Sequence, residues 1–372
     1  QDVVPIDPGS AAQWEHPPFS GEIADGYVWG RGALDNKFAL MGILEAVECL
    51  LQEGFKPVRT LYLAFGQDEE VGGYQGAAQI AATLRERGVE LELVLDEGGL
   101  ICEGVLAGVK RPVALIGVAE KGFLTLELRA EGHPGHSSTP APEDAINRLS
   151  RAIARLSAHP FPAHLDALQS MYRNLASDLP FGYRLALANT WLLGGTMKAR
   201  MGRNRAGNAL MRTTFAPTML QAGVKDNLIP AQASAVVNCR LLPGDTLTRV
   251  IAHIEKVAAK ENVSVHPLYQ GDSSDTSREA TPTSDPQGKG YRLLARVIRQ
   301  NFPDVAVTPY LVSGGTDARH FTPLCAQVLR FSPLCYTHDD LPRVHGVNER
   351  LPVKACGDVV VFYRRFIEAC AG

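Results

Sequence analysis

The chain has 372 residues, enough for two domains, and a formal net charge of -3. Hydrophobic residues make up 45% of it, as in ordinary globular proteins. We find no basic cluster and no acidic tail, so the charge pattern favours neither nucleic acid nor an anionic membrane surface as a partner. No apolar run is long enough to span a bilayer.

The seven cysteines are scattered and include no Cys-x-x-Cys pair. An odd, dispersed set predicts reduced, buried thiols rather than a disulfide framework, although it does not exclude export. The sequence begins at Gln1 without an initiator Met, so any targeting segment would precede the residues given. The location is therefore unknown from the sequence, and we take the cytoplasm as the default expectation.

The first part of the chain alternates predicted helices and strands. A helix is predicted over residues 39–51, with an apolar face made of Leu40, Met41, Leu44, Val47 and Leu51. The next predicted elements are a buried strand over 60–65, a helix over 75–87 and a strand over 91–95. This alternation predicts an α/β domain with a mainly parallel sheet and helices on both faces.

The pattern changes around residue 118. Residues 123–130 alternate apolar and polar side chains, as in an antiparallel strand with one solvated face. The elements predicted after it are a helix over 145–156, strands over 213–215 and 233–240, and a helix over 246–261. We infer a small α+β unit inserted into the first domain.

Two segments do not fit this scheme. Residues 160–210 are more than the small unit needs, and we expect them to form an irregular helical insertion near a substrate entrance. The alternative, a structural flap that contacts no ligand, fits the sequence equally well. Residues 271–290 are rich in Ser, Thr, Asp and Pro, which is typical of a linker. A helix over 291–300 then returns the chain to the first domain.

Acidic residues stand beside glycines at the ends of apolar runs. Glu69 and Glu70 follow the apolar run 60–65 and precede Gly72 and Gly73. Asp35 and Asp96 have similar surroundings. Active sites collect at strand ends in α/β sheets, and adjacent carboxylates can face different ways. One of the pair could therefore bind a metal while the other handles protons.

Each acid also has a simpler interpretation. A Glu-Glu pair before Gly-Gly is common in solvated turns. Asp35 is a typical N-cap for a helix starting at Asn36, and Asp96 could simply end a strand. Three such acids together with a suitable histidine favour a metal site over these alternatives.

The ordered motifs resemble the M20 family of co-catalytic zinc peptidases, in its branch of carboxypeptidase S and PM20D1-like N-acyl-amino-acid hydrolases. The matching segments, in chain order, are 2–5 (DVVP), 14–21 (WEHPPFSG), 30–37 (GRGALDNK), 68–73 (DEEVGG), 95–99 (LDEGG), 132–138 (GHPGHSS), 226–230 (DNLIP), 314–319 (GGTDAR) and 344–349 (VHGVNE). The family pattern at the first of these is His-x-Asp-x-x-Pro, so its His would precede Gln1.

The resemblance implies a domain plan. Residues 1–117 and 291–372 would form the catalytic domain of zinc-peptidase type, cut at its N-terminal end. Residues 118–270 would form an inserted α+β lid and dimerisation domain. The protein would then be a homodimer that pairs through the inserted domain.

The resemblance also implies a ligand set for two zinc ions per chain, with cobalt or manganese as substitutes. Asp35 would bridge the two metals. Glu70 and His345 would complete one site, while Asp96 and the His before Gln1 would complete the other. Mixed carboxylate and imidazole ligands with open positions suit catalytic zinc. His320 competes with His345 for the ligand role, and motif position favours His345.

Three further residues receive catalytic roles from the resemblance. Glu69 would take a proton from the metal-bound water and deliver it to the leaving nitrogen. Asp2 would orient the His before Gln1, although an isolated acid near a terminus is usually only surface. His136 would donate a hydrogen bond to the oxyanion in a partner subunit's site; otherwise it is a turn residue.

The resemblance assigns substrate contacts as well. Asn227 and Arg240 would hold the substrate's carboxylate, because a guanidinium binds carboxylates in a fork. The loop Gly314, Gly315 and Thr316 could add backbone N–H donors. Each of these residues could instead have a purely structural role.

The resemblance implies a hydrolase that cleaves the amide of N-acyl amino acids, or of peptides next to a C-terminal residue with a free carboxylate. One alternative is a dipeptidase or aminoacylase of narrower specificity. Another is a non-catalytic metal- or ligand-binding homologue, if the His of the first motif is truly absent. Glu69 argues against the latter, because metal binding alone does not require it. The acyl group, the preferred amino acid and the physiological metal do not follow from the sequence.

Overall fold

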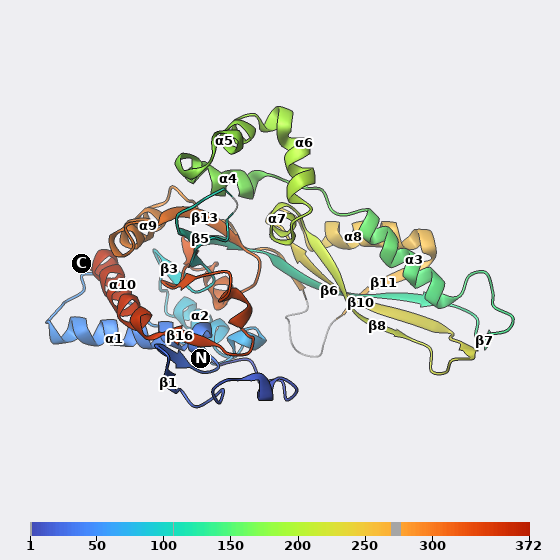
Figure 1. Ribbon diagram of the computed structural model, residues 1–372, viewed down its shortest axis with the longest axis horizontal. Helices are drawn as coiled ribbons and strands as arrows, with labels where there is room; N and C mark the ends of the chain where they lie inside the picture. Colours follow the sequence, from blue (N-terminus) through green and yellow to red (C-terminus); the bar gives the residue numbers. More distant parts are fainter. Residues whose placement is uncertain (1, 107, 269–276) are drawn as a thin grey trace. The chain divides into compact units, whose positions relative to one another are not determined.

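The computed structural model describes residues 2–106, 108–268 and 277–372 of the chain (Figure 1). The chain forms two compact units. The first consists of Gln1–Ala119, Gln169–Ala188 and Thr283–Gly372. The second consists of Glu120–Leu168 and Asn189–Pro282.

A six-stranded sheet forms the centre of the first unit. Its strands are β3 (Val94–Asp96), β4 (Leu100–Cys102), β5 (Val113–Glu120), β13 (Ala306–Val312), β14 (Val328–Arg330) and β15 (Cys335–Tyr336). The order is β15-β4-β5-β14-β3, with β13 paired to β5. The α/β class is confirmed.

The pairing in this sheet is mixed rather than mainly parallel. β3 with β14 and β4 with β15 are parallel, whereas β5 is antiparallel to both β4 and β14. The connection from β4 to β5 explains part of this, because it is too short for the crossover that a parallel pair needs.

Three helices build the main core with this sheet: α1 (Phe38–Gln52), α9 (Lys289–Asn301) and α10 (Val353–Ala371). A smaller apolar cluster joins α2 (Ala77–Glu86) to the short 3-10 helix η7 (Asp317–Phe321). A separate three-stranded sheet pairs β2 (Tyr27–Trp29) with β1 (Ile23–Ala24) and β16 (Arg350–Pro352). The helices predicted over 39–51, 75–87 and 291–300 are thus confirmed, with ends shifted by one or two residues.

The buried face of α1 differs from the predicted one. The helix buries Phe38, Ala39, Gly42, Ala46 and Leu50, whereas Met41, Leu44 and Leu51 are exposed. α1 packs against α10 so closely that a Cβ on Gly42 would lie 2.3 Å from Val359 Cγ1. Only small residues fit at the contact between α1 and α10. The predicted face was based on large apolar side chains and therefore missed them.

The predicted strand over residues 60–65 is wrong. This segment lies outside the strands among the described residues, and all six side chains are exposed. β3, which overlaps the next strand predicted along the chain (91–95), ends its sheet and pairs only with β14 within the described chain. An apolar run shows that the side chains are suited to burial. Whether a neighbouring strand is present to bury them does not follow from the run itself.

A second sheet organises the second unit. Its strands are β6 (Gly122–Glu131), β8 (Thr214–Ala222), β10 (Gln232–Leu241), β11 (Val263–Pro267) and β12 (Ser277–Arg278). The path runs β11-β6-β10-β8, and each of these pairs is antiparallel. Helices α3 (Ala145–Ala158) and α8 (Leu247–Ala258) form the core with the alternate buried residues of β6 and β10. The predicted α+β character is confirmed.

Residues 160–210 are helical, as predicted. They hold α4 (Asp166–Asn174), the 3-10 helix Ala176–Asp178, α5 (Phe181–Ala188) and α6 (Thr190–Met201), with α7 (Arg205–Met211) at the end. Residues 169–188 group with the first unit rather than with the insertion. There the Thr308 hydroxyl donates to the Met171 carbonyl oxygen at 2.6 Å, and Arg111 pairs with Asp178 at 2.8 Å.

Part of the predicted linker 271–290 lies outside the described residues. Within its described part, β12 adds to the second sheet and α9 begins at Lys289. Among the described residues, the helices include none that is long and apolar enough to cross a membrane.

Candidate active site

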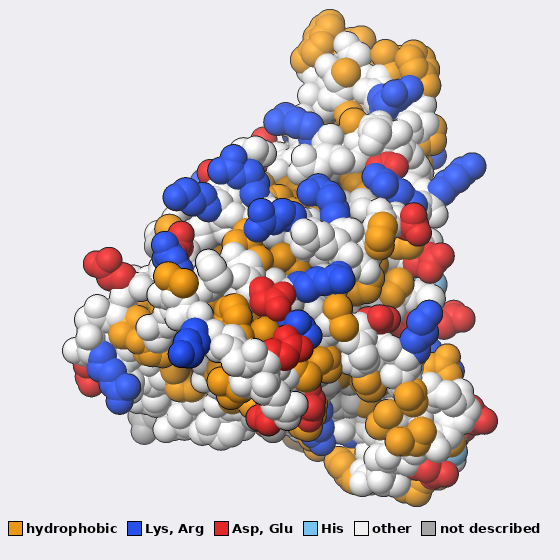
Figure 2. Space-filling view, turned by 90° about the vertical axis from the view of Figure 1, so that its left-hand side faces the viewer, with side chains coloured by type: hydrophobic (Ala, Val, Ile, Leu, Met, Phe, Trp, Pro, Cys, Tyr) orange, Lys and Arg blue, Asp and Glu red, His pale blue; other side chains and the backbone are white. Residues whose placement is uncertain are grey.

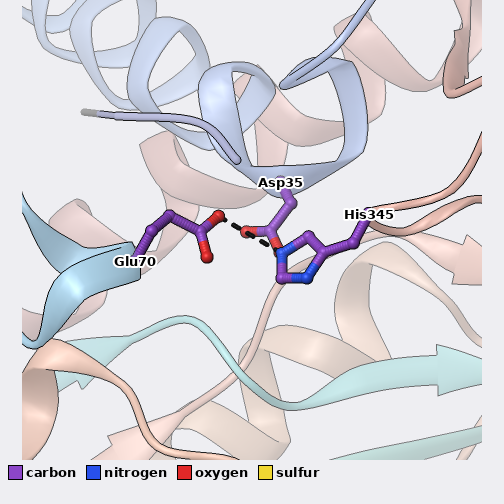
Figure 3. A group of neighbouring side chains, drawn as sticks. All are labelled: Asp35, Glu70 and His345. Carbon is purple, nitrogen blue, oxygen red and sulfur yellow. Dashed lines mark ion pairs between the residues drawn. The ribbon is translucent and has the colours of Figure 1, made fainter. Parts of the chain in front are cut away.

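Three predicted ligands converge in the first unit (Figure 3). His345 Nε2 lies 2.9 Å from Asp35 Oδ2 and 3.2 Å from Glu70 Oε1. One ligand atom from each residue lies within 4.8 Å of the other two. The three side chains come from segments far apart in the sequence, so only the fold assembles them.

Local backbone geometry explains how each side chain reaches this point. Glu70 lies in the short 3-10 helix η3 (Glu69–Val71), which Gly72 ends with a φ of 109°. His345 itself has a φ of 61°, in the left-handed region. Asp35 precedes α1 but does not cap it, because Lys37 is the N-cap residue. The N-cap alternative for Asp35 is therefore excluded.

A buried ion pair supports the Asp35 and His345 segments. Arg31 Nη1 lies 2.6 Å from Glu349 Oε2, and both side chains are almost fully buried. Glu349 Oε1 accepts the backbone N–H groups of Leu34 and Asp35, at 2.7 and 3.1 Å. Arg31 Nη2 also donates to the His345 carbonyl oxygen at 3.2 Å. The pair therefore ties both ligand segments to one point.

Asp2 holds the Glu69–Glu70 turn. Its two carboxylate oxygens accept the backbone N–H groups of Glu69 and Glu70, at 3.0 and 3.1 Å. Asp2 is therefore a positioning group for the acidic turn. It is not merely a surface residue, as an isolated acid near a terminus usually is.

The site concentrates negative charge in poorly solvated surroundings. Burial, followed by repulsion from Glu70 and Asp317, raises the pKa of Glu69 to about 8. Burial also raises the pKa values of Asp35 and Glu70, although His345 opposes both shifts. The pKa of Asp317 rises to about 7, mainly by burial and then by the charge of Asp96. This crowding of carboxylates is what a cation would relieve.

Asp96 lies at the end of β3, as predicted. Its Oδ1 accepts the Glu97 N–H at 2.9 Å, and its charge contributes to the raised pKa values of Glu69, Glu97 and Asp317. Asp96 therefore belongs to the same acidic surroundings, but it is not part of the Asp35, Glu70 and His345 group.

The predicted rival histidine and the glycine loop are not part of the Asp35, Glu70 and His345 group. His320 Nε2 is 3.0 Å from the Gly72 carbonyl oxygen, and its ring packs edge-on against Tyr74. Gly314 and Gly315 follow β13, and the buried Thr316 caps η7 by accepting the Ala318 N–H at 3.3 Å. Thr316 thus has a structural role whether or not this loop contacts a substrate.

His136 and Asn227 come together in the second unit. The short strand β7 (Gly135–His136) pairs with β9 (Leu228–Ile229), and the Asn227 carbonyl oxygen accepts the Ser137 N–H at 3.2 Å. His136 Nδ1 accepts the Ser138 N–H at 3.2 Å. Because Nδ1 is an acceptor, the neutral ring carries its proton on Nε2, and the exposed side chain can donate from there.

Arg240 lies on β10 of the same unit. Its guanidinium carbon is 4.7 Å from the centre of the Phe123 ring, and that of Arg278 is 5.6 Å from the same centre. Stacking on an aromatic face helps to hold a guanidinium in place.

Sequence reasoning gave no role to several of these residues: Arg31, Glu97, Asp317, Arg278 and Glu349. A signal existed for Arg31, Asp317 and Glu349, since all three stand inside the quoted motifs. Glu97 also follows Asp96 directly in one of them. No comparable signal marks Arg278, because only the pairing of β12 with β6 brings it to Phe123.

A family model described as Peptidase family M20/M25/M40 matches residues 1–369. The chain belongs to this peptidase family. Its members are metal-dependent hydrolases, so the chain is identified as a metallopeptidase or amidohydrolase.

Relatives within the family are similar over almost the whole chain. The N-fatty-acyl-amino acid synthase/hydrolase PM20D1 of Mus musculus is 40% identical over 99% of this chain and 72% of its own length. The PM20D1 of Xenopus tropicalis is 39% identical over 99% of this chain and 70% of its own length. A probable carboxypeptidase S-like 2 of Dictyostelium discoideum is 37% identical over 96% of this chain and 68% of its own length.

Solved structures of M20 enzymes share the fold. The metallo-carboxypeptidase Sso-CP2 of Sulfolobus solfataricus matches with a TM-score of 0.65 at 17% identity, over 98% of this chain and 82% of that chain. Human carnosine dipeptidase 1 matches with a TM-score of 0.59 at 16% identity, over 99% of this chain and 78% of that chain. At these identities the likeness supports the M20 fold alone.

Proposed function

We propose that this M20 chain is a di-zinc hydrolase that cleaves the amide bond of N-acyl amino acids, or of peptides next to a C-terminal residue with a free carboxylate. The convergence of Asp35, Glu70 and His345 carries this proposal. The names of the PM20D1 and carboxypeptidase S-like relatives favour this substrate class.

The donor set fits a divalent metal. Two carboxylates and one imidazole are typical ligands of catalytic zinc, and Asp96 adds a further carboxylate nearby. The raised pKa values of Asp35, Glu69 and Glu70 also fit, because a cation would compensate the crowded negative charge. When bound, the metal would supply an acidified water and polarise the substrate carbonyl.

Glu69 is the proposed general base. Its carboxylate belongs to the acidic surroundings of the ligands but not to the ligand group itself. In this role Glu69 would accept a proton from the activated water and later return it to the leaving nitrogen. Asp2 fixes the turn from which the Glu69 side chain projects.

The second unit would supply substrate contacts. Arg240, stacked on Phe123, suits the free carboxylate of the substrate, and Asn227 lies beside His136. The Nε2–H of His136 would donate to the oxyanion of the tetrahedral intermediate. The Gly314–Gly315–Thr316 loop is a further candidate for substrate binding through its backbone N–H groups.

We also propose a homodimer that forms through the second unit. β8 pairs with β10 on one side and ends the sheet among the described strands. Its Met219 and Leu220 are exposed. An open strand edge with apolar side chains is suited to pairing across a two-fold axis.

Metal removal and substrate choice test the proposed function together. Chelation should abolish hydrolysis of an N-acyl amino acid, and zinc or cobalt should restore it. The same substrate with its carboxylate amidated should react far more slowly, since a guanidinium prepared for a carboxylate would lose its partner. Full activity after verified metal removal would refute the metal mechanism, and equal rates for acid and amide would refute the carboxylate requirement.

A further inference from the structure

Helix α9 of the first unit has cations along one face and no acidic residue. Its 13 residues include Lys289, Arg292, Arg296 and Arg299 but neither Asp nor Glu. Positions three or four apart lie on the same side of a helix, so these four cations form one row about 15 Å long. All four are exposed. We call this row the basic stripe.

The opposite face of α9 belongs to the core of the first unit. Its buried residues are Gly290, Tyr291, Leu294, Ala295, Val297 and Ile298. The helix is therefore fixed in the fold, and the basic stripe is on its solvent side. Figure 2 shows the side of the molecule on which α9 and α10 lie in Figure 1, and Lys and Arg side chains gather on it.

The basic stripe is unfavourable for the isolated chain. Like charges three or four positions apart repel one another along a helix. Lys289 and Arg292 also stand in the first turn, where the helix dipole disfavours cations. Within the described part of the chain, none of the four cations forms an ion pair that would offset this repulsion.

Helix α3 of the second unit shows the ordinary way to accommodate such a row. It also contains arginines and no acidic residue. Its Arg151 lies 2.6 Å from Glu261, Arg155 pairs with the same carboxylate, and Arg148 lies 3.5 Å from Glu143. The arginines of α3 are thus neutralised within the chain, whereas those of α9 are not.

A hollow of about 560 Å³ lies beside the C-terminal end of the basic stripe, between α9 and α10. It is lined by Arg296, Gln300, Arg365, Glu368 and Ala369. Arg365 Nη1 donates to the Gln300 carbonyl oxygen and to Asn301 Oδ1, both at 3.0 Å, which fixes this guanidinium. Glu368 lies 3.3 Å from Arg364, which offsets its charge. The hollow therefore adds a positioned cation, Arg365, to the stripe.

We propose that the basic stripe and this hollow bind an acidic segment of another protein. A row of guanidinium groups suits a row of carboxylates, because each fork can hold one carboxylate. The acidic segment would supply the opposite charges that the chain itself does not place here. In the sequence, apolar residues separate these cations, so no basic cluster is apparent until the helix brings them to one face.

Other polyanions fit the basic stripe less well. An anionic bilayer would be held by charge alone, because α9 buries its apolar face and has none left to enter a membrane interface. A single-stranded nucleic acid usually stacks its bases on exposed aromatic rings, and the aromatic residue of α9, Tyr291, is buried. The proposal is independent of the substrate and of the metal centre.

A labelled peptide of about ten glutamates tests the proposal on the unaltered protein. Fluorescence anisotropy should show that it binds at low salt and is released as salt is added. Peptides of glutamine or lysine of the same length should not bind. An oligothymidylate of about ten nucleotides, and phosphatidylcholine vesicles containing about one third phosphatidylglycerol, should both bind more weakly than the glutamate peptide.

Two matched triple variants locate the binding site. The first is Arg292→Gln, Arg296→Gln and Arg299→Gln, which should weaken binding of the glutamate peptide at least about tenfold. The second is the control, with the same loss of charge at exposed positions of the first unit away from α9: Lys56→Gln, Arg85→Gln and Arg87→Gln. The control should bind like the wild type. Both variants should keep the urea midpoint of the wild type, because the six side chains are exposed.

Four results would overturn the proposal. The glutamate peptide could fail to bind at low salt, or the two triple variants could lose the same affinity. The oligonucleotide or the anionic vesicles could bind more tightly than the peptide, in which case the basic stripe serves another class of partner. Finally, the α9 variant could turn an oligomer into a monomer without changing peptide affinity, and the stripe would then be a contact between copies.

Discussion

Arg31 and Glu349 form an ion pair of 2.6 Å with almost no exposure to solvent. Through Glu349 the pair holds the backbone of Asp35, and through Arg31 it holds the carbonyl of His345. Two of the three converging ligands thus depend on one buried pair that binds no metal itself. Groups behind the ligands commonly control metal affinity in this way.

Glu349→Ala should therefore weaken both the fold and the metal site. Removing one partner leaves the Arg31 charge buried and unpaired, at a cost of about 3–5 kcal/mol in the free energy of unfolding. Zinc affinity, measured by competition with a chelating dye, should fall about 10–100-fold. Glu53→Ala is the control, because it breaks an exposed pair with Arg364 and should change the free energy of unfolding far less. Similar losses in both variants would contradict this account.

The adjacent acids Glu69 and Glu70 should respond differently to the same substitution. Glu69→Gln should keep bound metal and lose about 10²–10⁴ in kcat, because only proton transfer is removed. Glu70→Gln should lose metal, since it deletes a ligand of the group with Asp35 and His345. Metal analysis and steady-state kinetics on both variants provide the comparison. Equal metal content and equal rates would mean that the two roles are assigned wrongly.

Mixing two inactive variants tests the role of His136 in a dimer. Glu69→Gln and His136→Ala should each be nearly inactive alone. If His136 serves the partner's site, random pairing of equal amounts should restore about a quarter of wild-type activity, because half of the dimers are mixed and each has one intact site. No recovery, with subunit exchange shown by mass or fluorescence, would reject action across the dimer.

The close contact of α1 and α10 can be tested with a pair of glycines. Gly42→Ala places a Cβ 2.3 Å from Val359 Cγ1 and should lower the free energy of unfolding by about 1–3 kcal/mol. Gly195→Ala, inside α6, meets no atom within 4 Å and should be neutral or stabilise by up to about 1 kcal/mol. Urea unfolding of both variants gives the difference. A neutral Gly42→Ala would mean that the helices can separate without cost.

Lys121 should make stability depend on pH in the alkaline range. Burial, and then the charge of Arg240, lower the pKa of Lys121 to about 8, while its ammonium donates to the carbonyl oxygens of Ala209 and Arg212. Between pH 8 and about 10.5 the unfolded chain binds this proton and the folded chain does not. The free energy of unfolding must therefore rise with pH across this window. This gain is lost again as the pH falls back to 8.

The variant Lys121→Met should lack this rise. The gain of the wild type relative to the variant, from pH 8 to 10.5, should be about 3 kcal/mol in the free energy of unfolding. The exposed Lys260 gives the matched control, since Lys260→Met should leave the rise unchanged. A pH profile of Lys121→Met parallel to that of the wild type would refute the shifted pKa.

The sequence by itself determined the M20 family, the α/β class and most helices, because these depend on local periodicity and on ordered motifs. The alternation in 123–130 is an example, since every second residue of β6 is buried along its first nine positions. The motifs of the sequence also identified Asp35, Glu70 and His345 as candidate ligands without any knowledge of the geometry.

Only the tertiary structure decided which surfaces pair and which side chains meet. The apolar run 60–65 looks like a buried strand, yet its side chains are exposed, because burial needs a partner strand. Similarly, α1 buries the small residues Gly42 and Ala46 because α10 packs so close to it. Glu349 reaches the amide of Asp35 across 314 positions of the chain. Contacts over such separations depend on how elements pack in three dimensions, which a one-dimensional pattern does not record.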